Sequence, residues 1–534
     1  LEAVINSNGR SIIVAGPGSG KTRVITYKIA YLLYLGLKPE NILLVTFTRA
    51  AAKQMIERVK NVSLVVLFLS TILLLCFFWG NISFDSIKSQ QEVNAEEIPD
   101  ITYMIKPDQI VVTFGANNYT VIAPGNLDVW YNSSGAACMV KEIGRFGRAE
   151  NILVEEITDA QYQEVMQFRS ILAEFDYDIP MADFFQNYQI KKPSNYDVIE
   201  TVTAIGYSTA SEKHLFVYDG KNHKYYRLVA DVENADFEAL IASIEAKDYN
   251  SYNPISAYMG IEVENKTLIP VEIKTNLRTF LFRQESYSYQ TEKINAIAEN
   301  FFGRNMDFVR TITEDSGTVI YMYSYAKNVL IVNTDGSIEY KEEQTSDTEQ
   351  SFLEALETAV QFVARHGSWE SRNGAKLTPY LKDVSLNPNK KKGFRFTFGM
   401  EANGNRLFYE KGDPIVIDVT SGQVTYYKRN MIDFDQEDLE TIETYSAEAA
   451  FSPVNLIANN YEYLYHILET PDDKNMDEDQ FKAVATAVNK MQIGYVRMAD
   501  EGITEIYPVW MVLLNNTKVY FNLYSAEPIG YTKE

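Results

Sequence analysis

A glycine-rich loop near the start of the chain has the residue types that hold a phosphate group. Its eight residues are Ala15, Gly16, Pro17, Gly18, Ser19, Gly20, Lys21 and Thr22. The glycines let backbone N–H groups turn toward phosphate oxygens, the lysine reaches the outer phosphates, and the threonine hydroxyl holds Mg²⁺. The loop therefore predicts an ATP site in which Thr22 is the Mg²⁺ ligand.

Two predicted elements position this loop. Residues 11–15 (SIIVA) form a short apolar run that predicts a buried strand, and residues 23–35 follow with apolar side chains at helical spacing. A strand, a loop and a helix in this order are the context in which such a loop binds phosphate. Another apolar run at residues 41–45 predicts a second strand, so we expect residues 1–58 to form a P-loop α/β fragment.

This fragment resembles the superfamily 1 DNA helicases of the UvrD type. The segment AGPGSGKT at residues 15–22 is similar to the first motif of that family, and TFTRAAAKQM at residues 46–55 is similar to the next. In the family the polar residues of the second motif contact the backbone of single-stranded DNA. The resemblance covers residues 1–58, and it implies ATP binding and, for a working fragment, nucleic acid as a partner.

Several parts of a helicase motor are not recognisable in the chain. Phosphoryl transfer needs a catalytic carboxylate as well as a phosphate cradle, but no Asp-Glu pair follows a buried strand. The segment Ile415–Asp418 is superficially similar, yet it leads into a predicted hairpin turn at residues 420–422. No arginine finger or second motor lobe is recognisable. We expect a truncated fragment that binds nucleotide weakly if it folds, and neither hydrolyses ATP nor unwinds DNA.

An apolar run follows this fragment and predicts a membrane anchor. Residues 62–79 contain 18 residues without a charge, and a helix of that length reaches roughly 27 Å, close to the hydrocarbon thickness of a bilayer. Lys53, Arg58 and Lys60 precede the run, and acidic residues follow it from Asp85 onward. The positive-inside rule then predicts a single transmembrane helix at residues 61–80 with a cytoplasmic N-terminus. A buried core helix and a cleaved signal peptide are the alternatives.

The first 60 residues and the rest of the chain also differ in net charge. The 534 residues have a net charge of −23. Residues 1–60 contain nine basic and three acidic residues and carry +6, so the remainder carries −29. A surface this acidic argues against a body that grips nucleic acid. The two cysteines exclude a disulfide-rich scaffold, and a hydrophobic content of 46% excludes wholesale disorder.

The acidic body alternates between strand-like and helix-like segments. The predicted elements are a strand at 109–115, a helix from Thr158 or Asp159 through Leu172, a hairpin formed by 214–218 and 224–228, and a helix at 352–364. Residues 331–340 and 417–426 repeat a strand, a Thr-x-Gly turn and a second strand at an offset of 86 residues. We therefore expect repeated α+β modules, with a coincidence of common hairpin residues as the alternative.

We predict that this body is a multidomain α+β ectodomain. Its predicted parts are a stalk at 81–98 and three domains at 99–245, 246–365 and 366–534. It has no recognisable catalytic constellation, because none of its four histidines has metal-ligand spacing to another histidine or cysteine. Arg365-His366-Gly367 is similar to a phosphatase signature, but it follows a predicted helix where the signature follows a buried strand. No cofactor is expected for the ectodomain.

Several segments of the body resemble the YycH family, membrane-anchored regulators of a cell-wall two-component system. The similar segments are residues 110–115 (IVVTFG), 174–180 (EFDYDIP), 393–428 and 506–510 (IYPVW). The resemblance covers about residues 55–534 and implies an extracytoplasmic body that regulates a sensor histidine kinase together with a YycI-like partner. It brings no catalytic residues. An external binding module of unknown ligand is the alternative, and so is an ATP-binding protein of the helicase type.

The two resemblances meet at residues 55–60. Met55-Ile-Glu-Arg-Val-Lys60 fits the end of the helicase motif and also fits the start of a membrane protein, with an initiator methionine and a few charges before the anchor. We hypothesise that two proteins are joined here and that the native body begins at about Met55. A natural fusion and a gene-assembly artefact both remain open.

Overall fold

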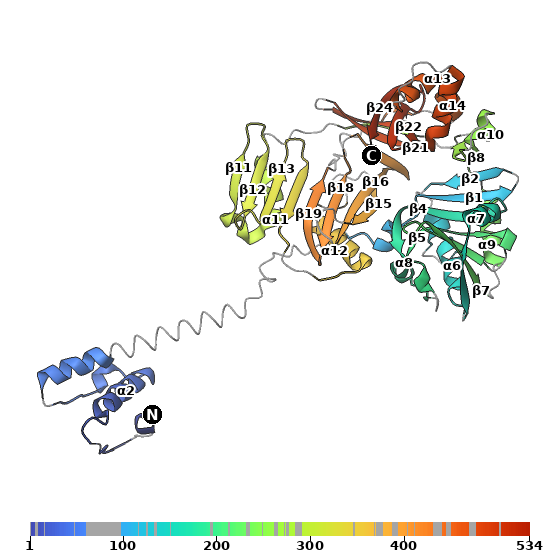
Figure 1. Ribbon diagram of the computed structural model, residues 1–534. Coiled ribbons are helices and arrows are strands. Elements are labelled where there is room, and N and C mark those ends of the chain that lie inside the picture. Colours follow the sequence, from blue (N-terminus) through green and yellow to red (C-terminus); the bar gives the residue numbers. More distant parts are fainter. Residues whose placement is uncertain are drawn as a thin grey trace. The chain divides into compact units, whose positions relative to one another are not determined.

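The computed structural model divides into two compact units, Leu1–Ser89 and Gln90–Glu534 (Figure 1). Each unit is described by itself. The first is described over residues 2–5, 9–14, 16–46 and 48–59. The second is described over residues 98–533 except for residues 116, 124–126, 133–135, 150, 193–195, 212–213, 231–234, 248, 261–264, 272, 274–276, 283–290, 345–347, 368, 370–376, 387–392, 403, 411, 431–440, 445–449, 469–476 and 501–502.

The predicted membrane helix at residues 61–80 lies outside the described residues. The predicted stalk does as well, apart from Ile98. Within the described ranges, no helix combines the length and the apolar character that crossing a membrane requires. The membrane anchor therefore stays a prediction.

Helices dominate the described part of the first unit. They are α1 (Glu2–Ile5), α2 (Lys21–Tyr34), the 3₁₀ turn η1 (Pro39–Asn41) and a helical stretch at residues 49–59. The α2 helix begins directly after Gly20, whose φ of 83° is accessible because glycine has no Cβ. Lys28 Nζ donates a hydrogen bond to the Val4 carbonyl at 2.7 Å and so links α2 to α1. The predicted helix after the loop is confirmed.

The two strands predicted in this unit are not formed in its described part, so the α/β expectation was wrong there. Residues 11–14 and 42–46 have neither helical nor strand pairing. Most of their apolar side chains face solvent, with Ile12 92% and Val14 91% exposed. A strand needs partner strands for its backbone hydrogen bonds and a packed layer for its side chains. The described residues of this unit supply neither.

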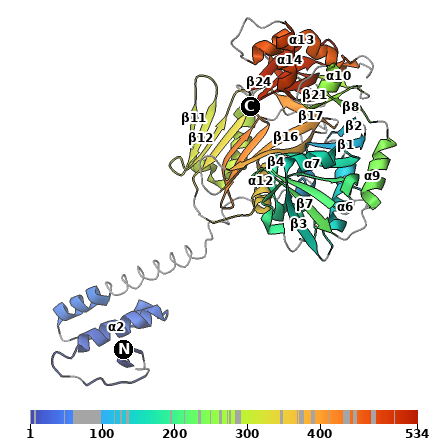
Figure 2. The ribbon, with the colours of Figure 1, turned by 45° about the vertical axis from the view of Figure 1, so that its right-hand side comes forward.

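A nine-stranded antiparallel sheet forms the first part of the second unit (Figure 2). Its order is β3-β7-β6-β5-β4-β1-β2-β8-β9. The strands are β1 (Gln109–Gly115), β2 (Asn118–Ile122), β3 (Ile152–Ile157), β4 (Ser170–Pro180), β5 (Thr201–Ser208), β6 (His214–Asp219), β7 (Lys224–Ala230), β8 (Ser251–Pro254) and β9 (Leu268–Pro270). The predicted strand at 109–115 and the predicted hairpin of β6 and β7 are confirmed.

Short helices accompany this sheet. They are α4 (Ile101–Met104), α5 (Leu127–Trp130), α6 (Met139–Phe146), α7 (Asp159–Met166), α8 (Met181–Asn187), α9 (Ala235–Glu245) and α10 (Ile255–Met259), with 3₁₀ turns η4 (Tyr196–Val198) and η5 (Thr209–Ser211). Thr158 caps α7 in a capping box with Gln161, as the sequence predicted for the start of this helix.

The helix predicted from Thr158 through Leu172 ends earlier than expected. The chain leaves α7 after Met166 and enters β4 at Ser170. Ile171 and Ala173 point to the buried face while Leu172 between them is only half-buried, which is the period of a strand. The β4 strand pairs with both β1 and β5, and this pairing on two sides overrides the local helical spacing.

The rest of the second unit is built on one 15-stranded sheet. Its path is β11-β12-β13-β14-β19-β18-β16-β17-β21-β22-β10-β20, with β15, β23 and β24 paired off this path. The strands are β10 (Arg278–Phe282), β11 (Arg310–Thr313), β12 (Val319–Tyr323), β13 (Asn328–Val332), β14 (Ile338–Glu342), β15 (Leu377–Leu386), β16 (Phe394–Ala402), β17 (Asn405–Tyr409), β18 (Ile415–Thr420), β19 (Gln423–Arg429), β20 (Thr441–Thr444), β21 (Val488–Asp500), β22 (Ile503–Leu514), β23 (Thr517–Asn522) and β24 (Pro528–Lys533).

Three modules of similar plan contribute to this sheet, each with helix before antiparallel strands. The first joins α11 (Thr291–Phe302) and η7 (Gly303–Phe308) to β11–β14. The second joins α12 (Phe352–His366) to β15–β19, and the third joins α13 (Pro453–Ile467) and α14 (Asp477–Ala487) to β21–β24. Among the described strands of the sheet, the β17–β21 pair is parallel and links the second module to the third.

The predicted repeat corresponds to two hairpins that lie next to each other in this sheet. Residues 331–340 fall in the hairpin β13–β14, and residues 417–426 fall in the hairpin β18–β19. Their second strands pair antiparallel, with Tyr340 opposite Tyr427. The β18–β19 turn places Ser421 and Gly422 at φ values of 53° and 77°, the pattern of a two-residue type I′ turn.

Strands from both sides of these predicted domain boundaries belong to the same sheet, so strand pairing does not mark where one domain ends. The boundary at residues 245/246 lies between α9 and β8, and β8 pairs with β2 of the first sheet. The boundary at residues 365/366 lies at the end of α12, and strands from both sides of it enter one sheet. The three-domain division therefore stays a prediction.

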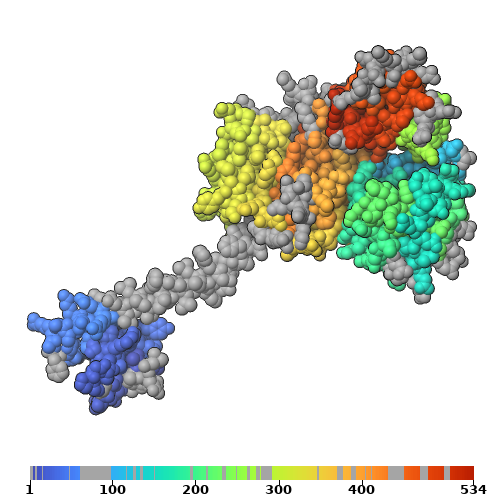
Figure 3. All heavy atoms as spheres, in the orientation of Figure 1, coloured from blue at the N-terminus to red at the C-terminus, as the bar shows by residue number. Residues whose placement is uncertain are grey.

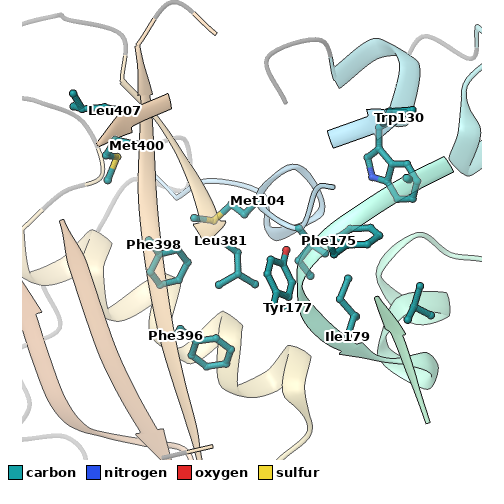
Figure 4. Packing of buried hydrophobic residues seen from close by; sticks show 14 of the residues in the cluster. Met104, Trp130, Phe175, Tyr177, Ile179, Leu381, Phe396, Phe398, Met400 and Leu407 are labelled. Carbon is teal, nitrogen blue, oxygen red and sulfur yellow. The ribbon is translucent and has the colours of Figure 1, made fainter. Parts of the chain in front are cut away.

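One apolar core runs from the first sheet into the second. Figure 4 shows Leu381 of β15 pointing toward Tyr177 of β4, with Met104 beside it. Phe396 and Phe398 of β16 continue the same core and are fully buried. The two sheets therefore meet through packed side chains within the second unit.

Candidate functional site

The predicted phosphate-binding loop has the local geometry of a cradle. Gly18 and Gly20 adopt φ values of 79° and 83°, which turns the backbone between a coil and the first residue of α2. Three donors converge on the carbonyl oxygen of Gly16. They are the Ser19 hydroxyl at 2.6 Å, Lys21 Nζ at 3.0 Å and the Ser19 amide at 3.3 Å.

This convergence fits an anion. A phosphate oxygen carries more negative charge than a carbonyl oxygen, and the N-terminus of α2 adds its positive end to the same place. Within the described residues, no atom beyond the adjacent residues lies within 4 Å of the Cβ positions of Gly16 and Gly18. Ala15 lies outside the described residues. Thr22, the predicted Mg²⁺ ligand, is the second residue of α2 and exposed.

The carboxylate that ATP hydrolysis needs is not supplied by the segment that looked similar to it. Asp418 lies on β18 of the second unit, directly opposite Arg395 of β16. The Arg395 guanidinium donates to both Asp418 oxygens at 2.7 and 2.9 Å. This carboxylate is a partner in a bidentate ion pair inside the antiparallel sheet.

His366 also has a structural role. It lies in the last turn of α12, which extends two residues beyond the predicted end at residue 364, and its Nδ1 lies 2.9 Å from the Phe362 carbonyl. Its ring packs against the rings of Phe301 and Phe362. Within the described ranges, no group of three or more His, Cys, Asp or Glu side chains is placed to hold a metal ion.

A buried ionic cluster joins the two sheets of the second unit. Lys106 Nζ donates to Glu401 of β16 at 2.7 Å, and both side chains are almost completely buried. Beside them, Asp108 pairs with both Arg406 of β17 and Lys490 of β21. Burial lowers the pKa of the Lys106 ammonium, and the charge of Glu401 opposes that shift.

Two further residues complete this ionic junction, which we define as Lys106, Asp108, Asp176, Tyr380, Glu401, Arg406 and Lys490. Asp176 of β4 approaches Arg406 at 3.3 Å and Lys490 at 3.8 Å. The Arg406 guanidinium lies over the Tyr380 ring, and its Cζ is 4.8 Å from the centroid of that ring. The junction alternates positive and negative groups from both sheets.

Sequence reasoning missed the ionic junction. Lys106 and Glu401 are 295 residues apart, and Asp108 and Lys490 are 382 residues apart. From the sequence alone, a charged residue beside a strand is interpreted as a solvated surface group, because its ion-pair partner in the fold is not known. A signal that could have been used is Glu401, a charged residue directly after FRFTFGM, a segment with a phenylalanine at every second position.

Two cavities flank the junction, and both are lined by Arg406, Lys490 and Gln492. The larger has a volume of about 770 Å³ and lies between the open face of β1, β2 and β4 and the strands β17 and β21. The smaller has a volume of about 560 Å³ and lies between β15, β17 and β23. Figure 3 shows a recess between the C-terminal module (red) and the strands of the first sheet.

Comparison with protein families supports the resemblance of the N-terminal fragment. Residues 1–195 match the model of the UvrD/REP helicase N-terminal domain. From residue 109 onward, that match includes the strands β1 to β4 of the antiparallel sheet of the second unit. The putative ATP-dependent DNA helicase YjcD of Bacillus subtilis is 50% identical over 62 residues, and the ATP-dependent DNA helicase PcrA of Staphylococcus aureus is 52% identical over 61 residues. Each alignment covers 11% of this chain and 8% of the helicase, so the chain spans a small part of the curated relatives.

Among solved structures, the crystal structure of YycH from Bacillus subtilis is similar to this chain with a TM-score of 0.48. The sequence identity is 10%, and the superposition covers 79% of this chain and 97% of that one.

Proposed function

We propose that the second unit is an extracytoplasmic regulator, anchored in the cell membrane by one helix, of a sensor histidine kinase that controls the cell wall. The observation that carries this proposal is the layout of the sequence around residues 62–79. A cationic flank, an uncharged apolar run of bilayer length and an acidic flank precede a large acidic body. The segments similar to the YycH family add the kinase and a YycI-like protein as partners.

A regulator of this kind acts through contacts that differ between the two states of the kinase. The apolar side chains of residues 62–79, with the Ser70 and Thr71 hydroxyls, offer a face to the membrane helices of the kinase. The ectodomain offers the outer contact. Either contact shifts the kinase equilibrium only if it is stronger in one state.

Protease treatment of intact Gram-positive cells tests the topology. The full chain carries one epitope tag at its N-terminus and another at its C-terminus. We expect external protease to remove the C-terminal tag and leave the N-terminal tag. A matched variant without residues 61–80 is expected to keep both tags, because it has no anchor to carry the body across. Protection of the C-terminal tag in the full chain would contradict the proposal.

Kinase output tests the regulatory step. Asparagine substitutions placed on each helical face of residues 62–79 are expected to change a kinase-dependent reporter on one face and not on the others. Immunoblots of the membrane fraction provide the control for insertion. An unchanged reporter for every face, with normal insertion, would exclude the membrane contact.

A second candidate function is ATP binding by the N-terminal fragment, as in a protein of the helicase type. The three donors on the Gly16 carbonyl favour it. Fluorescent ATP titrated into the full chain is expected to bind weakly, and Lys21→Ala is expected to weaken it about tenfold or more by removing the charged donor. Equal binding by both chains would contradict this function. DNA-dependent ATP hydrolysis would contradict the expectation of a fragment without motor activity.

A further inference from the structure

The larger cavity has the size of a ligand site. Its volume of about 770 Å³ lies within the range of roughly 300–1,000 Å³ that is typical of pockets for small ligands. One wall is the face of β1, β2 and β4 that points away from the main core. The opposite wall comes from β17 and β21 of the 15-stranded sheet. Clefts between two packed layers are common ligand sites.

A direct contact holds the rim of this cavity in place. Asn265, which lies just before β9, donates from Nδ2 to the Ala485 carbonyl at 2.9 Å and to the Val488 carbonyl at 2.6 Å. Figure 2 shows α10 and β8 beside α14. The cavity is therefore bounded by the ionic junction on one side and by this contact on the other.

Two cations lie where the cavity meets the junction. Arg406 is 10% exposed and Lys490 is 19% exposed. Asp108, at 3% exposed, is their inner counter-ion. Arg406 Nε is buried and has no hydrogen-bond partner in the described part of the structure. A buried N–H without an acceptor costs free energy, and an incoming acceptor removes that cost.

The second counter-ion of these cations is weakly held. Asp176 is 44% exposed, and its contacts with Arg406 and Lys490 are 3.3 and 3.8 Å long. Exposed ion pairs of this length contribute little to stability. A carboxylate that entered the larger cavity would therefore compete with Asp176 for the two cations at low cost.

The charge of the lining favours an anion locally. Three cations line the larger cavity, Lys266, Arg406 and Lys490, against two acids, Asp108 and Glu174. Burial raises the pKa of Glu174. The chain as a whole carries −23, so a cationic cavity wall stands out. The smaller cavity is lined by four acids, Asp176, Asp383, Glu410 and Asp413, and by five cations, so both cavities have the same excess of one positive charge.

The remaining walls combine amides with half-buried apolar side chains. Amide side chains supply both donors and acceptors, and apolar side chains accept an apolar group. The amide residues of the lining are Gln109, Asn117, Gln163, Gln167, Asn250, Asn405, Asn489 and Gln492. The apolar residues on the sheet faces are Val111, Val121, Leu172, Leu268 and Ile493.

We propose that the larger cavity binds the C-terminal end of a short peptide, whose free carboxylate is held by Arg406 and Lys490. The peptide groups match the amide side chains of the lining, and its apolar side chains match the sheet faces. This site does not depend on the membrane topology proposed above. A protein whose body faces the cytoplasm would contain the same cavity.

Peptide retention by the full chain tests this site. The purified chain in detergent is mixed with randomised tetrapeptides, made once with a free carboxyl terminus and once with a C-terminal amide. Gel filtration followed by mass spectrometry measures the bound peptides. We expect retention of free acids at least tenfold above that of amides, because a charge-assisted contact is lost in the amide. Equal retention of both forms, or of neither, would overturn the proposal.

Three variants connect the retention to the junction. Lys490→Gln is expected to reduce free-acid retention about tenfold, and it leaves Arg406 to balance Asp108. Asp176→Asn is expected to increase retention several-fold by removing the competing carboxylate, an effect that a purely structural role would not produce. Lys382→Gln is the matched control, because Lys382 is also a partly buried ion-paired lysine but lines the smaller cavity. Thermal unfolding of each variant confirms that it is folded.

A competition experiment distinguishes the carboxylate of a peptide from that of a small dicarboxylic acid. Succinate is added to the bound peptides at an equal concentration. Displacement at that concentration would mean that a small dicarboxylate occupies the site and would overturn the peptide proposal. Retention unchanged by Lys490→Gln and Asp176→Asn in folded chains would place the peptide elsewhere and would overturn it as well.

Discussion

The phosphate-binding loop and the ionic junction are both charged sites, but they are assembled over different distances along the chain. The loop contacts join residues three to five positions apart, as between Ser19 and Gly16 or Lys21 and Gly16. The ion pairs of the junction join residues separated by 230 or more, from Asp176 and Arg406 at 230 to Asp108 and Lys490 at 382. A local motif thus keeps its conformation without its sheet, whereas the junction exists only when two sheets meet.

Apolar residues show the same contrast. Ile12 and Val14 of the first unit are almost fully exposed, whereas Ile110 and Val112 of β1 are buried. In each pair the two residues are two positions apart within a short apolar segment. The difference lies in the neighbours, because β1 pairs with β2 and β4 on its two sides and packs against a core. Apolar sequence alone therefore does not make a strand.

The largest expected difference is in backbone protection. We expect amides of residues 9–14 and 42–46 to exchange with an opening free energy near zero, and amides of β4 and β16 to require global unfolding, typically about 5–15 kcal/mol. Hydrogen–deuterium exchange of the full chain, read by mass spectrometry, measures both. Slow exchange at residues 11–14 would show that a strand forms there and would break the comparison.

The second largest difference between the two regions is expected when an apolar side chain is truncated to alanine. Phe396 is fully buried in the shared core, so Phe396→Ala is expected to cost about 3–5 kcal/mol of unfolding free energy for the second unit. Val14→Ala is expected to change it by less than about 0.5 kcal/mol, because Val14 is exposed. Urea unfolding followed by tryptophan fluorescence measures both changes. A large effect of Val14→Ala would indicate that the first unit stabilises the second.

The Lys106–Glu401 pair is expected to show a smaller and asymmetric effect. Lys106→Met alone leaves the buried Glu401 carboxylate without its partner and is expected to destabilise by about 3 kcal/mol. The double variant Lys106→Met with Glu401→Leu is expected to recover most of that loss, because two apolar side chains need no counter-ion. The same urea experiment measures it. A double variant as unstable as the single would assign the loss to packing.

The smallest expected effect is a pH dependence from Glu174. Burial, opposed by the Gln109 hydrogen bond, raises its pKa above the ordinary value of 4.5 in the folded chain. The folded state therefore binds the proton more tightly, and this stabilisation is full below pH 4.5 and is lost as pH rises through the folded pKa. Glu174→Gln is expected to gain stability relative to the natural chain as pH rises. Parallel stability curves for the two chains would contradict the assignment.

Much of the local structure could be predicted from the sequence. The strand of β1, the hairpin of β6 and β7, the cap at Thr158 and the helix α12 all follow from patterns within a few residues. The repeat at residues 331–340 and 417–426 also predicted two hairpins. Their side-by-side pairing through β14 and β19 could not be predicted, because it joins residues 85 to 91 positions apart.

The misses share a physical cause. The helix expected through Leu172 became β4, since pairing with β1 and β5 outweighs local helical spacing. The strands expected at residues 11–15 and 41–45 did not form in the described residues, because a P-loop sheet needs partner strands that the described part of this unit does not supply. The candidate peptide site needed Arg406, Lys490 and Asp176 together, and no spacing in the sequence connects them.

By itself the sequence determined the glycine-rich loop, the helix caps, the hairpin turns and the division of charge around an apolar run, since each depends on side chains a few positions apart. The tertiary structure decided which apolar segments became strands, where charges were buried and how two sheets enclosed a cavity. Those features depend on contacts between distant segments. Their free energy comes from burial and pairing that a single segment cannot supply.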